Sequence, residues 1–452
     1  MDMDQSPLLT LPDEVVLAVL ACLPPGDVLS CSVLCRRLRG LCRDPELWRR
    51  LAVQPSADRW WRAALRFAPC LRELDLTAPY PTTEALQAVS TAMSSSACVV
   101  AKLTLDVRED LSGALTAALV QKTAALGGLN TVHLLIWESY ENNDIWDVSM
   151  LFTAVHEVPE LRELIIENTI VASDDWLECS AFEGSASLRK LTYSSLEDSD
   201  SPFLLERLLK RHASSLEHVR LYIGFAPVPV SLLAAIPGLR SLTCALSQYD
   251  DLSELKTSRG LNTLVLLGRN GPLPFPAGAL AFLRAAPQLR SVALPSSRPS
   301  PAAPLGALAE SPSASVLETL DLRGYEADLS EVAAALSRFP ALRTLALDVH
   351  KYQTDNFLPA VSPATAPRLT TLEMRVPLGA CPHAWLHDFA QDALERNPRL
   401  HLRTWFGTCP DKAKQCGWCR LGCHSRLGSI ERTAFAAHAK TTGCPGDCFR
   451  WC

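Results

Sequence analysis

The sequence has no long run of apolar residues near its start. The longest stretch there, residues 15–23, has nine residues, whereas a helix that spans a bilayer needs about 20. Residues 1–4 read Met-Asp-Met-Asp and lack the basic residues of a secretory leader. We therefore expect neither membrane contact nor secretion, and a location in the cytoplasm, the nucleus or both.

Sequence motifs of enzymes are also missing. There is no glycine-rich phosphate loop, no HExxH pattern and no GxSxG elbow in the 452 residues. We therefore expect a protein without catalytic residues and, outside the carboxy-terminal tail, without a cofactor.

The composition that is present is that of a folded chain. Hydrophobic residues make up 48%, charged residues 20%, and there are only 21 glycines, so disorder and collagen-like structure are excluded. The charge is uneven: residues 401–452 carry eight basic and three acidic side chains, a local +5, which leaves −11 for the first 400 residues of a chain whose total is −6. Seven of the 16 cysteines lie in the last 44 residues. The tail is therefore expected to form a separate unit.

A six-residue phrase with apolar first, fourth and sixth positions repeats along the chain with a mean spacing of about 27 residues. Its first positions are Leu71, Val100, Leu129, Leu161, Leu188, Leu216, Leu239, Leu261, Leu289, Leu317, Leu342 and Leu369. A thirteenth copy, counted from Leu400, is broken because Arg403 takes the fourth position. Residues two apart share one face of a strand, so each phrase predicts a short strand with its fourth and sixth positions in the core.

Helical patterns separate the phrases, for example at residues 203–209, 280–286, 332–336 and 385–394. Seven phrases follow directly after a proline, and proline ends a helix because it lacks a donor and disfavours helix in the residue before it. These prolines are Pro69, Pro159, Pro237, Pro287, Pro340, Pro367 and Pro398. One strand and one helix per repeat are expected.

The phrase and its period resemble the leucine-rich repeat family over about residues 69–400. The resemblance implies an α/β solenoid with a parallel sheet on its concave side. The asparagine or cysteine usual three residues beyond the last leucine is absent in every copy, so an irregular solenoid is expected. The alternative is a non-repeating α/β domain with leucine-rich strands. Residues 295–312, with five prolines, are expected to form a mobile insertion.

Residues 8–53 break the repeat and predict a compact set of helices. Pro12 stands beside two acidic residues at a helix start, and apolar residues follow at helical spacing up to Leu23. Asp27 is expected to cap a second helix that carries Val28, Leu29 and Leu34, and a third helix opens at residues 44–48. A piece of about 45 residues has a marginal core, and a partner would stabilise it.

The ordered series Leu-Pro-Asp-Glu-Val-Val at residues 11–16, Asp-Val-Leu at 27–29, Val-Leu-Cys-Arg-Arg-Leu at 33–38 and Asp-Pro-Glu-Leu-Trp at 44–48 resembles an F-box. The resemblance implies docking on a Skp-type adaptor and, through it, on cullin and RING subunits. The contacts it assigns to the adaptor are Leu11, Pro12, Leu29, Leu34, Leu47 and Trp48. Leu38 stands where the family commonly has an aromatic residue. Simple core packing is the alternative for these residues, and Cys22, Cys31, Cys35 and Cys42 are expected only to pack.

The expected domains are therefore an F-box at 8–53, a helical linker at 54–68, a leucine-rich-repeat solenoid at 69–400 and a basic Cys-rich tail at 401–452. In the tail, zinc is a candidate cofactor, held by Cys416 and Cys419 with Cys444 and Cys448 of a later cluster. Free reduced thiols and, in an oxidising compartment, disulfides are the alternatives.

The third, fifth and seventh positions of each phrase are expected on the concave side, where a target would bind. These positions are acidic in the early repeats and turn apolar at Ala245, Val265, Leu267, Ala293 and Pro295. We expect Arg220, Tyr222, Val265 and Leu267 to contact the target, unless a helix or the 295–312 segment covers this strip.

The leading interpretation is the substrate-recognition subunit of an SCF-type ubiquitin ligase, which holds a protein target for ubiquitination and contributes position rather than chemistry. Two alternatives stay open: a non-degradative interaction scaffold, and, less favoured, a nucleic-acid-associated protein that uses the basic tail.

Overall fold

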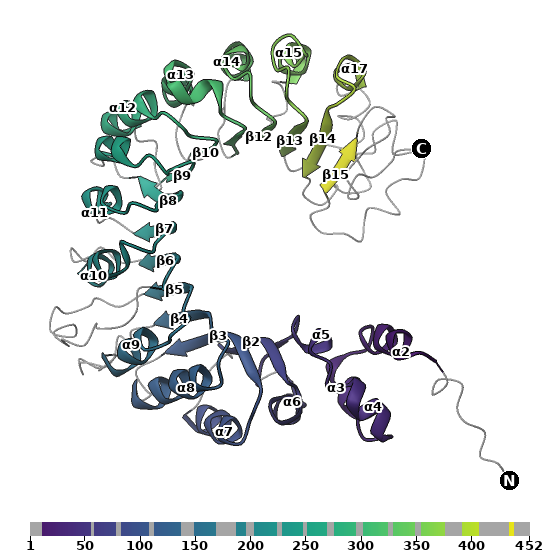
Figure 1. Cartoon of the computed structure of the whole chain (residues 1–452). Helices are drawn as coiled ribbons and strands as arrows, with labels where there is room; N and C mark the ends of the chain where they lie inside the picture. Colours follow the sequence, from purple (N-terminus) through teal and green to yellow (C-terminus); the bar gives the residue numbers. More distant parts are fainter. Residues whose placement is uncertain are drawn as a thin grey trace, which may run out of the picture. The chain divides into compact units, whose positions relative to one another are not determined.

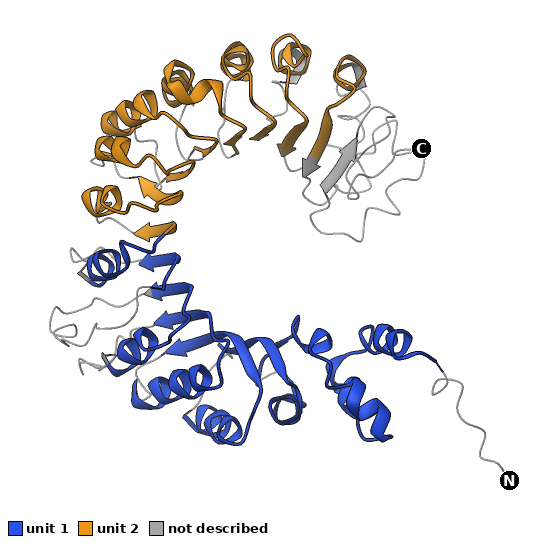
Figure 2. Ribbon diagram, in the orientation of Figure 1, with its two compact units in different colours: residues 1–216 blue, residues 217–452 orange. Residues whose placement is uncertain are grey.

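The computed structural model describes residues 11–55, 58–77, 83–107, 113–136, 149–168, 187–195, 203–223, 228–246, 251–268, 275–294, 302–323, 329–348, 354–375, 391–405 and 434–437. The chain divides into two compact units, residues 1–216 and residues 217–452 (Figure 2).

The described part of unit 1 opens with four short helices: α2 Asp13–Leu20, α3 Pro25–Cys31, α4 Arg36–Leu41 and α5 Pro45–Trp48. Asp13 and Glu14 lie in the first turn of α2, where the helix dipole favours negative charge. Asp44 caps α5 by accepting the backbone N–H of Glu46 at 2.8 Å.

The second expected helix was placed wrongly. It begins at Pro25 rather than after Asp27, because proline fits the first helical position, and it ends at Cys31. Leu34 lies in the turn that follows, before α4 begins with Cys35 as its N-cap.

The repeat begins within unit 1 as a parallel sheet in sequential strand order, with helices along one side of the strands (Figure 1). Its elements are β1 Ala52–Val53, α6 Trp61–Phe67, β2 Cys70–Leu76, α7 Thr83–Ser94, β3 Val99–Val107, α8 Gly113–Ala125, β4 Thr131–Ile136, α9 Ser149–His156, β5 Glu163–Asn168, β6 Lys190–Ser195 and α10 Phe203–His212.

Unit 2 continues the same alternation, with 3-10 turns (η) in some repeats. Its elements are β7 His218–Ile223, α11 Val230–Ala234, β8 Ser241–Leu246, η2 Ser253–Thr257, β9 Thr263–Gly268, α12 Ala277–Ala285, β10 Ser291–Ala293, α13 Ala302–Glu310, η3 Pro312–Ser315, β11 Thr319–Leu322, α14 Leu329–Ala335, η4 Leu336–Arg338, β12 Thr344–Asp348, α15 Thr354–Ala360, β13 Thr371–Arg375, α17 Gln391–Arg396, β14 His401–Trp405 and β15 Ala434–Ala437. Strands β7–β14 are parallel in sequential order, and β15 pairs antiparallel with β14.

The predicted core positions are confirmed. Leu74, Leu103 and Val132 occupy the fourth positions of successive phrases; they pair in register across β2, β3 and β4 and are fully buried. The third, fifth and seventh positions lie on the opposite face of each strand, which we call the open face. The expected α/β repeat with a parallel sheet is therefore present in both units.

Three of the seven prolines that precede a phrase closely follow the end of an α-helix as expected, whereas Pro359 lies inside α15. Helix α6 ends two residues before Pro69, α12 two residues before Pro287, and α17 two residues before Pro398. Successive repeats are then tied together just before each strand. The carbonyl of Arg240, for example, accepts the N–H groups of Asn262 and Thr263, both at 3.0 Å.

The last phrase was counted one residue out of register. Leu402, not Arg403, pairs with Leu372 and is buried, while Arg403 pairs with Glu373 on the open face. The copy therefore begins at Arg399 and keeps its apolar fourth position. The parallel sheet consequently continues to Trp405, past the boundary expected at residue 400.

The segment expected as a mobile insertion is largely helical. Residues 302–310 form α13, which buries Pro304, Leu305, Ala307 and Leu308, and residues 312–315 form η3. The apolar spacing of Leu305 and Leu308 outweighs the local proline content because it completes the helix layer of this repeat. Residues 295–301 lie outside the described residues.

Among the helices that the structure describes, none is long and apolar enough to cross a bilayer.

Candidate functional site

In the helical segment, which comprises α2–α5, Arg37 links the first helix to the third. Arg37, on α4, donates from Nε to Oδ1 of Asp13 at 2.9 Å and from Nη2 to the carbonyl of Leu11 at 2.5 Å. These bonds fix the start of α2 against α4. Arg39 adds a bond from Nε to the carbonyl of Ser32 at 3.1 Å, which holds the turn that contains Val33 and Leu34.

Trp48 is a core residue, which corrects its assignment as an adaptor contact. Its side chain is 0% exposed, and its Nε1–H donates to the carbonyl of Cys42 at 2.7 Å. The indole packs edge-on against Phe67 of α6, with 6.3 Å between ring centroids, and the Arg43 guanidinium lies 5.1 Å from the Phe67 ring. Trp48 thus links the helical segment to the first repeat helix and has no surface to offer a partner.

Most of the remaining assigned contacts reach the surface. Leu34 is 71% exposed and Pro12 is exposed, while Leu11, Leu29 and Leu47 are half-buried. These five residues are placed where a partner could reach them.

Sequence reasoning missed three exposed apolar residues of the same segment: Val15, Val19 and Val33, of which Val33 is 70% exposed. Together with Leu34 they account for four of the six large apolar side chains that are exposed in the described parts of the chain; the others are Met150 and Tyr222. The sequence does contain a pattern that could have indicated the exposure of Val15 and Val19. Helix α2 buries Val16 and Leu20, so Val15 and Val19 form a second apolar stripe that one buried face cannot absorb.

The cysteines of this segment differ in environment. Cys42 is buried, and burial together with the nearby Cys31 and Cys35 thiols raises its pKa to about 11. Cys22 is exposed rather than packed, contrary to expectation. The raised pKa of Cys42 makes it an unreactive core thiol.

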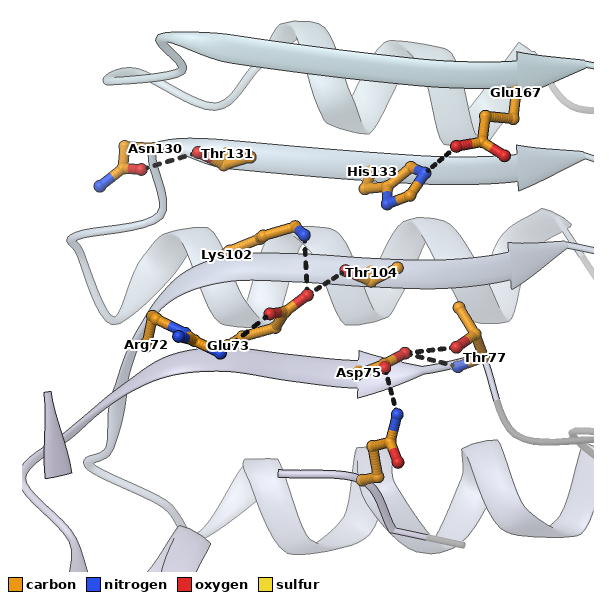
Figure 3. A network of polar contacts seen from close by, with 11 residues as sticks. Arg72, Glu73, Asp75, Thr77, Lys102, Thr104, Asn130, Thr131, His133 and Glu167 are labelled. Carbon is orange, nitrogen blue, oxygen red and sulfur yellow. Dashed lines mark hydrogen bonds and ion pairs between the residues drawn. The ribbon is translucent and has the colours of Figure 1, made fainter. Parts of the chain in front are cut away.

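The open face of unit 1 carries a network of polar contacts (Figure 3). Glu73 Oε1 contacts Lys102 Nζ at 2.8 Å and accepts from Thr104 Oγ1 at 2.9 Å. Two strands further on, His133 Nε2 lies 3.1 Å from Glu167 Oε1. Glu73 and Glu167, acidic residues predicted on this face in the early repeats, are therefore paired with side chains of neighbouring strands of the same sheet.

Asp75 belongs to the same network. Burial raises its pKa, but hydrogen bonds from Thr77 and Gln54 outweigh this and hold the pKa below its ordinary value. Gln54 follows β1, so this contact connects the end of the helical segment to the sheet.

The predicted target-contact residues lie on the open face of unit 2. The register aligns Arg220, Thr243 and Val265 on β7, β8 and β9, and it pairs Leu267 with Ala245. Arg220 and Tyr222 are exposed, the tyrosine by 39%, whereas Val265 and Leu267 are half-buried. The structure therefore brings the four residues onto one face of β7 and β9, with β8 between the two strands.

The other end of this face is charged and internally paired. Arg323 contacts Asp321 at 2.5 Å and Glu373 at 3.9 Å, and Arg403 contacts Glu373 at 3.6 Å. The hydrogen bond from Arg323 to Asp321 raises the pKa of the guanidinium.

The candidate zinc ligands Cys416, Cys419, Cys444 and Cys448 lie outside the described residues. Within the described ranges, no group of three or more His, Cys, Asp or Glu side chains is arranged to hold a metal ion.

Comparison with known proteins bears on the helical segment and on the fold. Residues 8–54 match the family model of the F-box-like domain. The chain is similar to a solved structure from the yeast Rad7 and Elc1 complex, at 16% identity and a TM-score of 0.45, over 86% of this chain and 92% of that one. It is also similar to a chain of the TLR13–ssRNA13 complex, at 14% identity and a TM-score of 0.35, over 80% of this chain and 59% of that one. No curated protein matches.

The match of residues 8–54 coincides with the helical segment that exposes Val15, Val19, Val33 and Leu34. The parallel strands and helices that follow form the repeat anticipated from the apolar phrase. The chain therefore carries an amino-terminal F-box-like domain, and a repeat of parallel strands and helices follows it.

Proposed function

We propose that this chain is the substrate-recognition subunit of an SCF-type ubiquitin ligase. In this proposal the F-box-like domain binds a Skp-type adaptor, which connects the chain to cullin and RING subunits in the cytoplasm or the nucleus. The observation that carries the proposal is the concentration of four exposed large apolar side chains in a domain that matches the F-box-like model.

Those side chains would gain free energy from burial against a partner. Single exposed apolar residues are ordinary, but four within residues 15–34 form a concentration that usually has a partner. Complete burial of a valine or leucine side chain contributes about 1.5–3 kcal/mol. Val33 and Leu34, at 70% and 71% exposure, therefore have most of that contribution still to gain.

The role proposed for the repeat is to hold the protein target near the ligase without chemistry of its own. Positioning a reactant is itself a large contribution to rate, and the covalent steps would belong to other subunits. Target binding is assigned to the open face of unit 2, at Arg220, Tyr222, Val265 and Leu267.

The experiment that tests the adaptor contact uses exposed positions, so that folding is not disturbed. The double variant Val33→Asp with Leu34→Asp should weaken binding of a purified Skp-type adaptor at least 30-fold, since about 2 kcal/mol of apolar contact is replaced by buried charge. Met150→Asp is the matched control because Met150 is a 52% exposed apolar residue outside the F-box-like domain. Undiminished adaptor binding by the double variant would refute the proposal.

A further inference from the structure

One row of open-face residues runs straight across unit 2. Its members pair strand by strand at the fifth position of each phrase. In order they are Arg220, Thr243, Val265, Ala293, Asp321, Ala346, Glu373 and Arg403. Neighbouring strands lie about 4.8 Å apart, so Arg220 and Val265, two strands apart, are separated by about 9.6 Å along the row.

Arg220 differs from the other arginines of this face. Arg323 and Arg403 each contact Glu373, and Arg323 also contacts Asp321. Arg220 is exposed and has no ion pair within the described residues. Within the part of the chain that the structure describes, its guanidinium is therefore a positive charge without an acidic partner.

Among the described open-face residues of β8, β9 and β10, none carries a negative charge that could neutralise Arg220. The open-face positions of β8, β9 and β10 that the structure describes hold only hydroxyl and apolar side chains. They are Ser241, Thr243, Ala245, Thr263, Val265, Leu267, Ser291 and Ala293. An acidic group that binds at Arg220 meets no competing negative charge there, and an apolar group beside it meets Val265 and Leu267.

The distance between Arg220 and the apolar side chain of Val265 favours one conformation of a bound peptide. A polyproline II segment has three residues per turn and rises about 3.1 Å per residue, so residues i and i+3 project from the same side about 9.3 Å apart. This matches the separation of about 9.6 Å between Arg220 and Val265 across two strand spacings. An i, i+2 pair or an i, i+4 pair would project to different sides.

We infer that the open face of unit 2 binds an extended target segment in which an acidic residue and an aliphatic residue lie three positions apart. The acidic side chain pairs with Arg220, with Tyr222 beside it, and the aliphatic side chain packs on Val265 and Leu267. The inference rests on the proposed receptor role, since it names the class of target that this role requires.

The test measures fluorescence polarisation of short labelled peptides against the purified full chain. The probe carries Glu-Pro-Pro-Leu between Ser-Gly flanks. The comparison peptides carry Gln-Pro-Pro-Leu, Glu-Pro-Pro-Ser, Glu-Pro-Leu and Glu-Pro-Pro-Pro-Leu. The probe should bind about two- to fivefold tighter than each of them, as expected for loss of one exposed ion pair or one apolar contact.

Two variants test whether the peptide binds at Arg220. Arg220→Glu should weaken the probe about tenfold, because attraction is replaced by repulsion, and should bind a Lys-Pro-Pro-Leu peptide better than the original chain does. Arg259→Glu is the matched control, since Arg259 is exposed in unit 2 but lies in a turn before β9. Thermal unfolding of both variants should match the original chain, which separates binding from folding.

Several outcomes would overturn the inference: equal binding of all the peptides, no peptide binding, or an Arg220→Glu loss that the lysine peptide does not rescue. Binding of a labelled single-stranded RNA that Arg220→Glu abolishes, without peptide binding, would overturn it in favour of nucleic acid. None of these outcomes touches adaptor binding, which Val33 and Leu34 test separately, so the two proposals fail independently.

Discussion

Val53 pairs with Leu74, and both side chains are fully buried. Val53 lies inside the segment that matches the F-box-like model, whereas Leu74 is the fourth position of the first repeat phrase. The pairing makes the end of the F-box-like domain the first strand of the sheet, and the carbonyl of Leu51 accepts the N–H groups of Arg72 and Glu73 beside it. The F-box-like domain is therefore structurally continuous with the repeat.

Truncation of residues 1–53 should consequently damage unit 1 rather than only remove adaptor binding. It strips β1 from β2 and leaves a strand edge and the Phe67 face uncovered. We expect a lower unfolding midpoint and increased aggregation, measured by differential scanning calorimetry and light scattering. A truncated chain as stable as the complete one would show that β1 contributes nothing to the sheet.

Trp48→Ala should destabilise unit 1 by about 3–5 kcal/mol, the usual cost of removing a buried aromatic side chain. Urea unfolding measures it. Trp48→Phe, which keeps an aromatic ring but loses the bond to the Cys42 carbonyl, should cost clearly less. If Trp48→Ala leaves stability unchanged yet abolishes adaptor binding, the indole is a contact residue after all.

Among the residues proposed to contact the adaptor, substitution should reduce adaptor affinity most where the side chain is most exposed in the unbound chain. Leu34→Ala should cost about 1–2 kcal/mol in adaptor binding, roughly five- to thirtyfold, because Leu34 is 71% exposed before binding. Leu11→Ala with Pro12→Ala should also weaken binding, but Leu11 is already half-buried and part of its loss will appear in stability. Isothermal titration of each variant, with its unfolding curve, separates the two. The reverse order of binding losses would argue for a different docking face.

Unit 1 should lose stability in mild acid through a pair of stacked histidines. His156 and His212 lie at the ends of α9 and α10 with ring centroids 5.7 Å apart. Burial, the nearby Arg211 and, for His212, the neighbouring His156 lower both pKa values from the ordinary 6.5 to about 4. Between these pH values the unfolded chain binds more protons than the folded one.

Stability should therefore be fully present above pH 6.5 and fall as the pH drops toward 4, by up to about 1.4 kcal/mol per pH unit for each histidine. His212→Phe keeps a ring in the stack and removes one titrating group, so it should reduce the slope by about half. Urea unfolding between pH 7.5 and 4.5 gives both slopes. An unchanged slope in His212→Phe would exclude the pair as the cause.

The proposed zinc ligands of the carboxy-terminal tail are Cys416, Cys419, Cys444 and Cys448. If they bind zinc, protein purified without chelator should carry close to stoichiometric metal, measured by mass spectrometry of the metal content. Chelation should then expose the tail thiols to a thiol reagent, because metal binding is coupled to folding. Clearly substoichiometric zinc would favour free thiols or disulfides.

The strand faces and several helix ends could be predicted from the local sequence pattern. The fourth and sixth positions of each phrase form a buried ladder because side chains alternate along a strand, and Pro69, Pro287 and Pro398 follow helix ends because proline lacks a donor. The last phrase is the exception: counted from Leu400, it puts Arg403 at the core position that Leu402 occupies.

The sequence by itself determined the period of the repeat, the faces of its strands and the F-box-like order of residues 11–51, since these depend on neighbours a few positions away. Only the tertiary structure decided that Trp48 is buried, because Phe67 of α6 packs against the indole from outside the F-box-like domain, and that Leu34 is exposed in the turn between α3 and α4. It also decided that Arg220 and Val265 share a row and that Arg220 has no ion pair among the described residues. Repeat lengths vary between 22 and 32 residues, so strand register, and with it the charge partner of each open-face residue, is fixed by hydrogen bonds between strands rather than by spacing along the chain.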